Sequence, residues 1–314
     1  MDFRILRYFV AIAEEGSISR AAERLRIAQP ALSAQVRNLE SELGSPLLHR
    51  MPRGVAVTES GAKLLGHARH ILRSAALARE DLLGDAAVII GDVTVSFPQS
   101  VAMVLTRPVV EEVLRALPRV SLSVRESNTG YMSELLRTGR IDLGFVFRQA
   151  DTVGLKARRL VEEDLVVIGP PGAFERGHEG LAPKPLRFAR LAPLPLVIPG
   201  RPHSLREVLN DYARRARAEL SVVVEVDAIP QIKELVAAGA GHAVLSYNAV
   251  REDLGSGRLS GARITSPSLH RSVFLCGHAE LPQTRAVRAV EKIILEVTAG
   301  LVETGIWKAR LASP

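Results

Sequence analysis

Gln29, Ser33 and Arg37 are the residues of this sequence whose types and positions most directly suggest a chemistry. An arginine can pair with the edge of a guanine and a glutamine with the edge of an adenine, while a serine tolerates either base. The neighbouring apolar residues repeat at helical spacing on another face and leave these three side chains free to meet a partner. The pattern predicts contacts with DNA in the major groove. The alternative is a helical hairpin in a protein core whose polar residues are merely hydrated.

Two short helices must hold these side chains in place. The first is predicted to begin at Ser17 or Ser19, either of which can cap it. A link of three residues leads to the second helix, which starts at Gln29-Pro30, with the proline suited to the first turn, and ends at Gly44. A link this short holds two helices at a steep angle, as in a helix-turn-helix. The buried face of the second helix is predicted to consist of Leu32, Val36, Leu39 and Leu43.

Residues 49–57 follow the second helix and read as two short strands joined by a turn, which is typical of a wing. Arg50 and Arg53 are expected to lie along phosphates or to enter the narrow minor groove. A solvated turn with two arginines is the alternative. With a supporting helix at its start, the segment 1–58 is predicted to be a winged helix-turn-helix that binds double-stranded DNA. The predicted contacts with DNA are Gln29, Pro30, Ser33, Arg37, Arg50 and Arg53.

This segment resembles the DNA-binding domain of the LysR-type transcriptional regulators. The matching residues are Phe9, Gly16, Ser17, Ser19, Arg20, Ala21, Ala22, Leu25, Ala28, Gln29, Pro30, Ala31, Leu32, Ser33, Leu39, Glu40, Leu43, Gly44, Pro46, Leu47, Arg50, Thr58 and Gly61. The resemblance implies a sequence-specific regulator that binds an interrupted inverted repeat. Ala34 departs from the family, which often has a long polar residue there, so the base preference of relatives is not transferred. Leu48 also departs, since an aromatic residue is frequent at its position.

Residues 59–87 contain no proline and are predicted to form one long helix, capped by Thr58. An apolar stripe runs along this helix at three-to-four spacing and consists of Leu65, Ala68, Leu72, Ala75 and Leu82. A single stripe on a long helix needs a partner helix to bury it. The resemblance implies that this helix is the linker through which family members form homodimers, and that two dimers form a homotetramer.

Strands and helices alternate from residue 88 onward, which predicts an α/β domain with a mostly parallel sheet and right-handed crossovers. The order of elements resembles the two-lobed periplasmic-binding-protein-like effector domain of the same family. The domain is expected to cover 88–314, with lobe 1 at about 88–163 and 264–300 and lobe 2 at about 164–263. The last strand and helix would return to lobe 1, so the chain is expected to cross between the lobes twice.

The loops after the strands are the predicted place for a small-molecule effector, because ligands of open α/β sheets lie beyond the carboxyl ends of the strands. Helix N-termini, hydroxyls and two arginines in these loops favour an anion, and a carboxylate is expected. By resemblance to the family, the contacts with the effector are Ser100, Thr129, Phe147, Arg148, Arg201, His203, Ser204 and Ile229. Residues 199–206 also resemble the nitrogen-assimilation-control subgroup, which leaves open a regulator that needs no effector and is controlled by its own abundance.

The composition fits a globular protein of two or three domains, with 314 residues, 47% hydrophobic residues and a net charge of +7. This charge is compatible with a polyanionic partner but does not identify one, since the basic residues are spread along the chain. The single Cys276 fits a reducing cytoplasm and is expected in a buried strand. No signal peptide, membrane span, cofactor or metal site is expected, because the apolar runs are short and His67 and His70 have no further ligand beside them.

Other classes of protein fit parts of the sequence. An enzyme is suggested only by residues 239–244, whose glycines lead from a helix into a strand, the reverse of a dinucleotide site. A solute-binding protein would match the two-lobed half, but not the N-terminal segment or the expected lack of a signal peptide. A non-specific nucleoid protein would not need the two-lobed half. The sequence therefore predicts a cytoplasmic, DNA-binding transcriptional regulator that is not an enzyme.

Overall fold

The computed structural model describes residues 1–52, 54–83 and 88–312. Its internal contacts divide the chain into two compact units. Unit 1 comprises Met1–Val88 with Glu280–Arg285, and unit 2 comprises Ile89–Ala279 with Ala286–Pro314. Within the described part of the chain, no helix has an apolar stretch long enough to span a bilayer.

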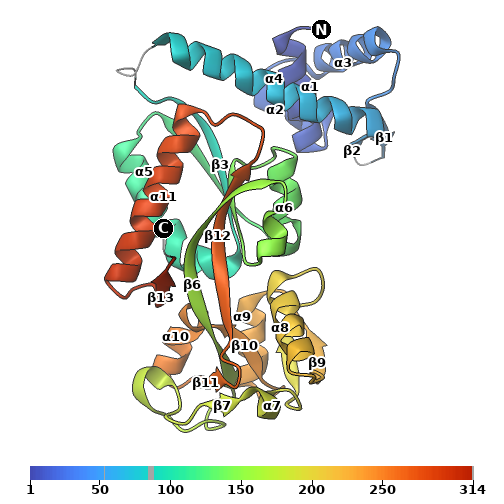
Figure 1. Ribbon diagram of the computed structural model, residues 1–314. Coiled ribbons are helices and arrows are strands. Elements are labelled where there is room, and N and C mark those ends of the chain that lie inside the picture. The colour runs from blue at the N-terminus through green and yellow to red at the C-terminus, as the bar shows by residue number, and fades with distance from the viewer. Residues whose placement is uncertain (53, 84–87, 313–314) are drawn as a thin grey trace. The chain divides into compact units, whose positions relative to one another are not determined.

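Unit 1 combines helices with a small β-hairpin (Figure 1). Its elements are α1 (Phe3–Glu15), α2 (Ile18–Leu25), α3 (Gln29–Leu43), β1 (Leu48–Met51), β2 (Gly54–Val57) and α4 (Glu59–Leu83). The side chain of Ser17 accepts a hydrogen bond from the backbone N–H of Arg20 and caps α2. Gly44 ends α3 in the left-handed region, at φ 63°. These boundaries and the antiparallel pairing of β1 with β2 confirm the helix-turn-helix and the hairpin that were predicted.

The back of α3 is buried in the core of unit 1. Leu32, Val36 and Leu39 are at most 2% exposed, as predicted. Leu43 is 43% exposed, so its prediction as a buried residue is wrong. It lies in the last turn of the helix, immediately before Gly44, where the apolar face of α3 ends.

The apolar stripe of α4 is divided between two environments. Leu65 and Ala68 are buried, and Leu65 packs in a cluster with residues of α1 and α3 of its own unit. Leu72 and Ala75 are half-buried, while Leu82 is 89% exposed. The first half of the stripe therefore attaches α4 to its own domain, and only the second half is left for another helix.

Unit 2 consists of two lobes. Lobe 1 contains β3 (Gly91–Phe97), α5 (Gln99–Ala116), β4 (Val120–Glu126), α6 (Thr129–Arg137), β5 (Leu143–Val146), the 3-10 helix η1 (Gln149–Thr152) and α11 (Arg285–Glu303). Lobe 2 contains η2 (His178–Gly180), β7 (Leu186–Arg187), α7 (Phe188–Leu191), β8 (Leu196–Ile198), α8 (Ser204–Arg215), β9 (Val222–Glu225), α9 (Ile229–Ala237), β10 (Ala243–Ser246), α10 (Tyr247–Ser256) and β11 (Ser260–Thr265). Each lobe buries its own apolar core, and in lobe 1 the rings of Phe97 and Phe145 stack with centroids 5.1 Å apart.

Long strands join the lobes. β6 (Leu155–Gly169) pairs with β12 (His270–His278) up to Asp164 and then with β10 and β11 of lobe 2. Figure 1 shows β6 and β12 running side by side from one lobe into the other. The expected double crossing is therefore confirmed. A short strand, β13 (Ala309–Leu311), follows α11 and pairs with β6 near the middle of its length.

The sheet is mixed, so the expectation of a mostly parallel sheet is wrong. β3 is parallel to β4 and β5, whereas β12 is antiparallel to β5, and β10 and β11 are antiparallel to β6. The reason is that β6 leaves lobe 1 and β12 returns to it, so these paired strands must run in opposite directions. Cys276 lies on β12 and is fully buried, and this burial raises the pKa of its thiol to about 12. It has the buried strand position that was predicted.

Candidate DNA-binding surface and effector cleft

The exposed front of α3 carries the predicted base contacts. Gln29 and Pro30 form its first turn, Arg37 follows two turns later, and all three side chains are exposed. Ser33 differs, because it is only 5% exposed. Its hydroxyl oxygen accepts a hydrogen bond of 2.9 Å from Nη1 of Arg37. The expectation that Ser33 is free to meet a partner is therefore wrong, and the structure places it where it can orient Arg37.

The hairpin is held in place beside α3. The backbone N–H of Val55 donates to the carbonyl oxygen of Gly16, between α1 and α2. Gly54 lies at φ 134°, and a Cβ there would collide with the same carbonyl oxygen, so only glycine fits. Arg50 is exposed on β1, opposite Val55. Arg53 lies outside the described residues.

Glu40 is a positioning residue of this surface that the sequence analysis did not single out for a role. Its Oε1 accepts from the backbone N–H groups of Leu47 and Leu48 at 2.7 and 3.1 Å. One carboxylate of α3 therefore fixes the start of β1. Thr58 caps α4 as predicted, because its hydroxyl accepts from the N–H of Gly61 and donates to the carbonyl oxygen of Pro46. These local bonds hold the hairpin and the helices as one body.

In unit 2, the predicted effector contacts lie at helix N-termini of both lobes. Thr129 is the first residue of α6, Ser204 the first of α8 and Ile229 the first of α9, while Ser100 is the second residue of α5. The structure brings several of them together across the lobes. The N–H of Ser204 donates to the hydroxyl oxygen of Thr129 at 3.0 Å, and the N–H of Ile229 donates to Oε1 of Gln99 at 2.6 Å.

Asp151 adds a second contact between the lobes at Ser204. The hydroxyl of Ser204 donates to Oδ2 of Asp151 at 3.2 Å. Burial raises the pKa of Asp151, and the positive charge of Arg148 and the Ser204 hydrogen bond oppose this rise. Arg148 itself lies 4.0 Å from the carboxylate of Asp211 on α8. The N-terminus of α8 is thus already occupied by side chains of lobe 1.

Ser100 and Phe147 lie together at a buried ion pair that the sequence did not reveal. Arg271 of β12 donates through Nη2 to the hydroxyl oxygen of Ser100 at 2.8 Å and through Nε to Oε2 of Glu163 at 2.7 Å. Its guanidinium lies 3.9 Å from the ring centroid of Phe147. Arg271 and Glu163 are 4% and 1% exposed. Arg271 and Glu163 are 108 residues apart in the chain, so no local signal in the sequence links them.

His203 and Arg201 differ in their surroundings. Nδ1 of His203 accepts from the N–H of Leu205 and caps α8. Burial, followed by the charge of Arg271, lowers the pKa of His203 to about 4, so the ring is neutral at physiological pH. Arg201 is exposed, and its Nε lies 3.5 Å from Oε1 of Glu207. It lines a surface hollow along α8 and not the pocket between the lobes.

A pocket of about 200 Å³ lies between the lobes, beside these contacts. It is lined by Pro98, Gln99, Glu126, Ser127, Asn128, Thr129, His203, Asp227 and Ala228. Of the eight predicted effector contacts, Thr129 and His203 line it. Its lining includes the acidic side chains of Glu126 and Asp227, and carboxylates repel an anion. The acidic lining of this pocket therefore does not favour the expected carboxylate effector.

Comparisons with known proteins agree with this architecture. Residues 87–299 match the family model described as the LysR substrate binding domain, and residues 3–62 match the model of bacterial regulatory helix-turn-helix proteins of the lysR family. The chain belongs to the LysR family. Two similar relatives are the nitrogen assimilation regulatory proteins of Escherichia coli and Klebsiella aerogenes. The first is 30% identical over 98% of this chain and 99% of its own length, and the second 31% identical over 95% and 96%.

Solved structures of full-length LysR-family regulators share the fold. A variant of OxyR from Pseudomonas aeruginosa superposes with a TM-score of 0.76 at 25% identity, covering 94% of this chain and 98% of its own. CbnR in complex with its target DNA gives a TM-score of 0.52 at 23% identity over 95% of this chain and all of its own, which supports the fold alone. This LysR-family chain is thus a DNA-binding transcriptional regulator with an effector-type domain. The resemblance seen in its sequence is confirmed.

Proposed function

We propose that this regulator recognises an interrupted inverted repeat through α3 and the β1–β2 hairpin. The observation that carries the proposal is the two-sided character of α3, whose back is buried while Gln29 and Arg37 are exposed on its front. Gln29 and Arg37 would read base edges in the major groove, with Pro30 against the DNA backbone. Ser33 would act at this interface by holding Arg37. Arg50 and Arg53 would contact phosphates or the minor groove.

Footprinting on the DNA upstream of the chain's own gene tests this proposal. The wild-type protein should protect two half-sites about one helical turn apart, ~10 bp between centres. Gln29→Ala should abolish the footprint at protein concentrations that still give non-specific binding. Lys292→Ala, which removes an exposed charge from α11, is the control and should leave the footprint unchanged. Equal loss for specific and random DNA in Gln29→Ala would mean that Gln29 reads no base.

We propose a DNA-binding domain at 1–58, a dimerisation segment at 59–87, of which residues 84–87 lie outside the described residues, and an effector domain at 88–314. The effector domain would comprise lobe 1, at about 88–163 and 264–300, and lobe 2, at about 164–263. The half-buried second part of the α4 stripe supports a homodimer, and two dimers would form the homotetramer. A protein of this kind acts on the chromosome in the cytoplasm and performs no catalytic step.

For unit 2 we propose that a small molecule acts in the inter-lobe cleft at Ser100, Thr129, Phe147, Arg148, His203, Ser204 and Ile229, by changing the angle between the lobes. Arg201 is left out because it lines the surface hollow along α8. The carboxylate class follows from the hydroxyls and from Arg148 among these residues. The acidic lining of the pocket argues against a carboxylate and favours a ligand with hydrogen-bond donors or a positive charge. Thermal-shift screening of the full-length protein against small carboxylates and small amines separates these classes. Saturation at a hundred times the dissociation constant should stabilise the domain by ~2.7 kcal/mol.

A second candidate is a regulator without an effector, controlled by its own abundance. It is favoured by the internal pairing of the cleft residues, because Thr129, Ser204 and Ile229 already bond across the lobes and Ser100 already bonds to Arg271. An effector would have to replace these bonds. Failure of both compound classes to shift the melting temperature, with a footprint that is intact without any added compound, would support this candidate over the first.

A further inference from the structure

The C-terminal segment 305–311 connects both lobes, although it comes directly after a helix of lobe 1. Gly305, at φ 71°, turns the chain after α11. Trp307 is fully buried in the core of lobe 1. β13 then pairs antiparallel with residues 161–163 of β6. This is the part of β6 that lies immediately before its pairing with β10 and β11 in lobe 2.

Lobe 2 holds the same segment through α10 and η2. The side-chain amide of Asn248 accepts from the N–H of Lys308 at 2.9 Å and donates to its carbonyl oxygen at 3.1 Å. Nη1 of Arg251 donates to the carbonyl oxygen of Ile306 at 2.7 Å. Nζ of Lys308 lies 2.9 Å from Oε1 of Glu179. Because most of these bonds go to the backbone of the segment, they fix its path and not merely its side chains.

Glu163 lies at the centre of these connections. Its Oε1 accepts from the indole N–H of Trp307 at 2.7 Å and from the amide of Asn248 at 3.3 Å, while its Oε2 accepts from Arg271. One buried carboxylate therefore collects donors from the C-terminal segment, from α10 and from β12. A buried charge is stable only while its partners stay in place, so the C-terminal segment, α10 and β12 are held together around Glu163. Arg271 also bonds to Ser100 and so connects this cluster to the cleft.

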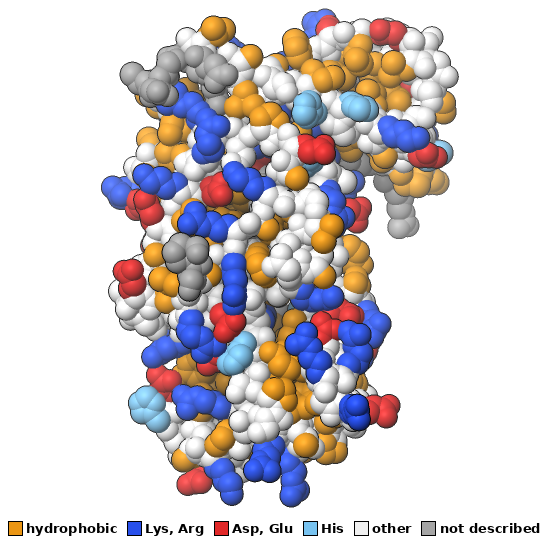
Figure 2. Space-filling model, in the orientation of Figure 1, with side chains coloured by type: hydrophobic (Ala, Val, Ile, Leu, Met, Phe, Trp, Pro, Cys, Tyr) orange, Lys and Arg blue, Asp and Glu red, His pale blue; other side chains and the backbone are white. Residues whose placement is uncertain are grey.

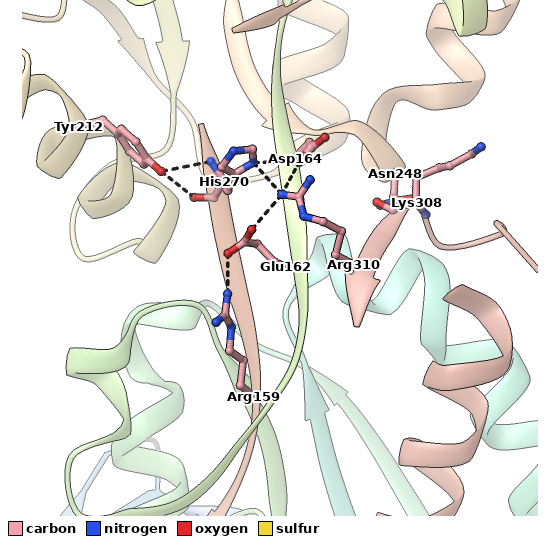
Figure 3. Close-up of polar contacts among 8 residues, drawn as sticks. All are labelled: Arg159, Glu162, Asp164, Tyr212, Asn248, His270, Lys308 and Arg310. Atoms are coloured by element: carbon pink, nitrogen blue, oxygen red, sulfur yellow. Dashed lines mark hydrogen bonds and ion pairs between the residues drawn. The ribbon is translucent and has the colours of Figure 1, made fainter. Parts of the chain in front are cut away.

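The exposed side of the same crossing is held by a second group of charges (Figure 3). Nη2 of Arg310 on β13 donates to Oε1 of Glu162 at 2.9 Å and to Oδ1 of Asp164 at 3.1 Å, both on β6. Nδ1 of His270 on β12 lies 2.8 Å from Asp164, and the hydroxyl of Tyr212, on α8 of lobe 2, accepts from the N–H of His270. The short strand is thus tied to both crossing strands at the hinge.

We propose that residues 305–311 form an inter-lobe clasp that limits the change in angle between lobes 1 and 2. The β6 and β12 strands alone would leave a two-stranded hinge. The clasp adds a third chain segment at the hinge, and its contacts with lobe 2 come from Asn248, Arg251 and Glu179. Its release lets the lobes reorient while each keeps its own core. Its influence on the cleft rests on the proposed effector function, whereas the restraint on the lobes does not.

The test measures the distance between the lobes in the full-length protein without any added compound. Spin labels are placed at Tyr131→Cys on α6 and Arg190→Cys on α7, which are exposed, while the buried Cys276 stays unlabelled. Labelled chains are diluted into unlabelled ones so that each distance is measured within one chain. Asn248→Ala should broaden the distance distribution and increase hydrogen exchange of the amides of 305–311 at least tenfold, which corresponds to ~1.4 kcal/mol.

Arg251→Ala, at an exposed position, repeats the test if Asn248→Ala fails to fold. Arg258→Ala is the matched control, because its ion pairs with Asp253 and Glu234 lie within lobe 2, and it should change neither readout. Faster exchange of the segment with an unchanged distance distribution would overturn the proposal and make the segment a local cover of the core. Since no effector is needed, this result is independent of whether the cleft binds one.

Discussion

The hydrogen bond between Ser33 and Arg37 makes a sharp prediction about DNA recognition. A base contact from Arg37 is worth ~1–3 kcal/mol, so Arg37→Ala should weaken operator binding by roughly 5- to 150-fold. Ser33 is 5% exposed and bonds to Arg37 at 2.9 Å. Its own effect should equal the loss of one partly exposed hydrogen bond to a charged group, about 1 kcal/mol or roughly fivefold.

The assay is a double-mutant cycle with the single and double alanine variants, measured by fluorescence anisotropy on an operator fragment and on random DNA. Ser33→Ala should weaken operator binding about fivefold in the wild-type background and hardly at all in the Arg37→Ala background. Binding to random DNA should change less in both cases. Full additivity of the two substitutions would refute the reasoning, because it would mean that Ser33 contacts DNA independently of Arg37.

Three further outcomes are expected. Arg50→Ala and Arg53→Ala should each lower the slope of log affinity against log salt by roughly one, and an unchanged slope would remove that residue from the phosphate contacts. The double substitution Leu72→Glu and Ala75→Glu should convert the protein to monomers in sedimentation velocity. Unit 1 should stay folded, because both side chains are only half-buried in the single chain. A dimer that persists would place the interface elsewhere. The pKa of His203 is near 4 in the folded protein, against 6.5 in the unfolded chain, so the folded state binds fewer protons between these pH values. His203 therefore contributes stability above pH 6.5 that is lost as the pH falls to 4. The loss is about 3 kcal/mol, and His203→Asn, which can still cap α8, should flatten the plot of melting temperature against pH over that range.

Unit 1 was predictable because its signals are local. Ser17, Pro30 and Gly44 mark helix ends within a few residues, and the apolar positions of α3 repeat at helical spacing. The exposure of Ser33 was misjudged because it lies beside Leu32 and Val36 at the margin of the apolar face. A helical wheel shows direction, but it does not show which neighbouring helix covers that margin.

The hinge of unit 2 was less predictable for a different reason. The first ten residues of β6 are rich in Lys, Arg, Glu and Asp and show no apolar pattern, so the sequence does not mark this part of the strand. These charges are paired with partners from other elements, such as Glu162 with Arg310 and Glu163 with Arg271. Their partners are 148 and 108 residues away in the chain, so no local pattern reveals them.

Charge is therefore used differently in the two halves of this regulator. On the face shown in Figure 2, Lys and Arg side chains are scattered and do not gather in one patch, so the net charge of +7 alone does not mark the DNA-binding surface. In unit 1 the polar groups of α3 are available because apolar residues hold its back. In unit 2 the charges hold the hinge, and a buried pair such as Glu163–Arg271 stabilises little by itself but costs about 3–5 kcal/mol when one partner is lost. Forming the Glu163–Arg271 pair gains little free energy, but breaking it is costly. The pair therefore restricts the arrangements of the two lobes to those in which both partners stay in contact. A hinge that joins two independent cores requires such a restriction.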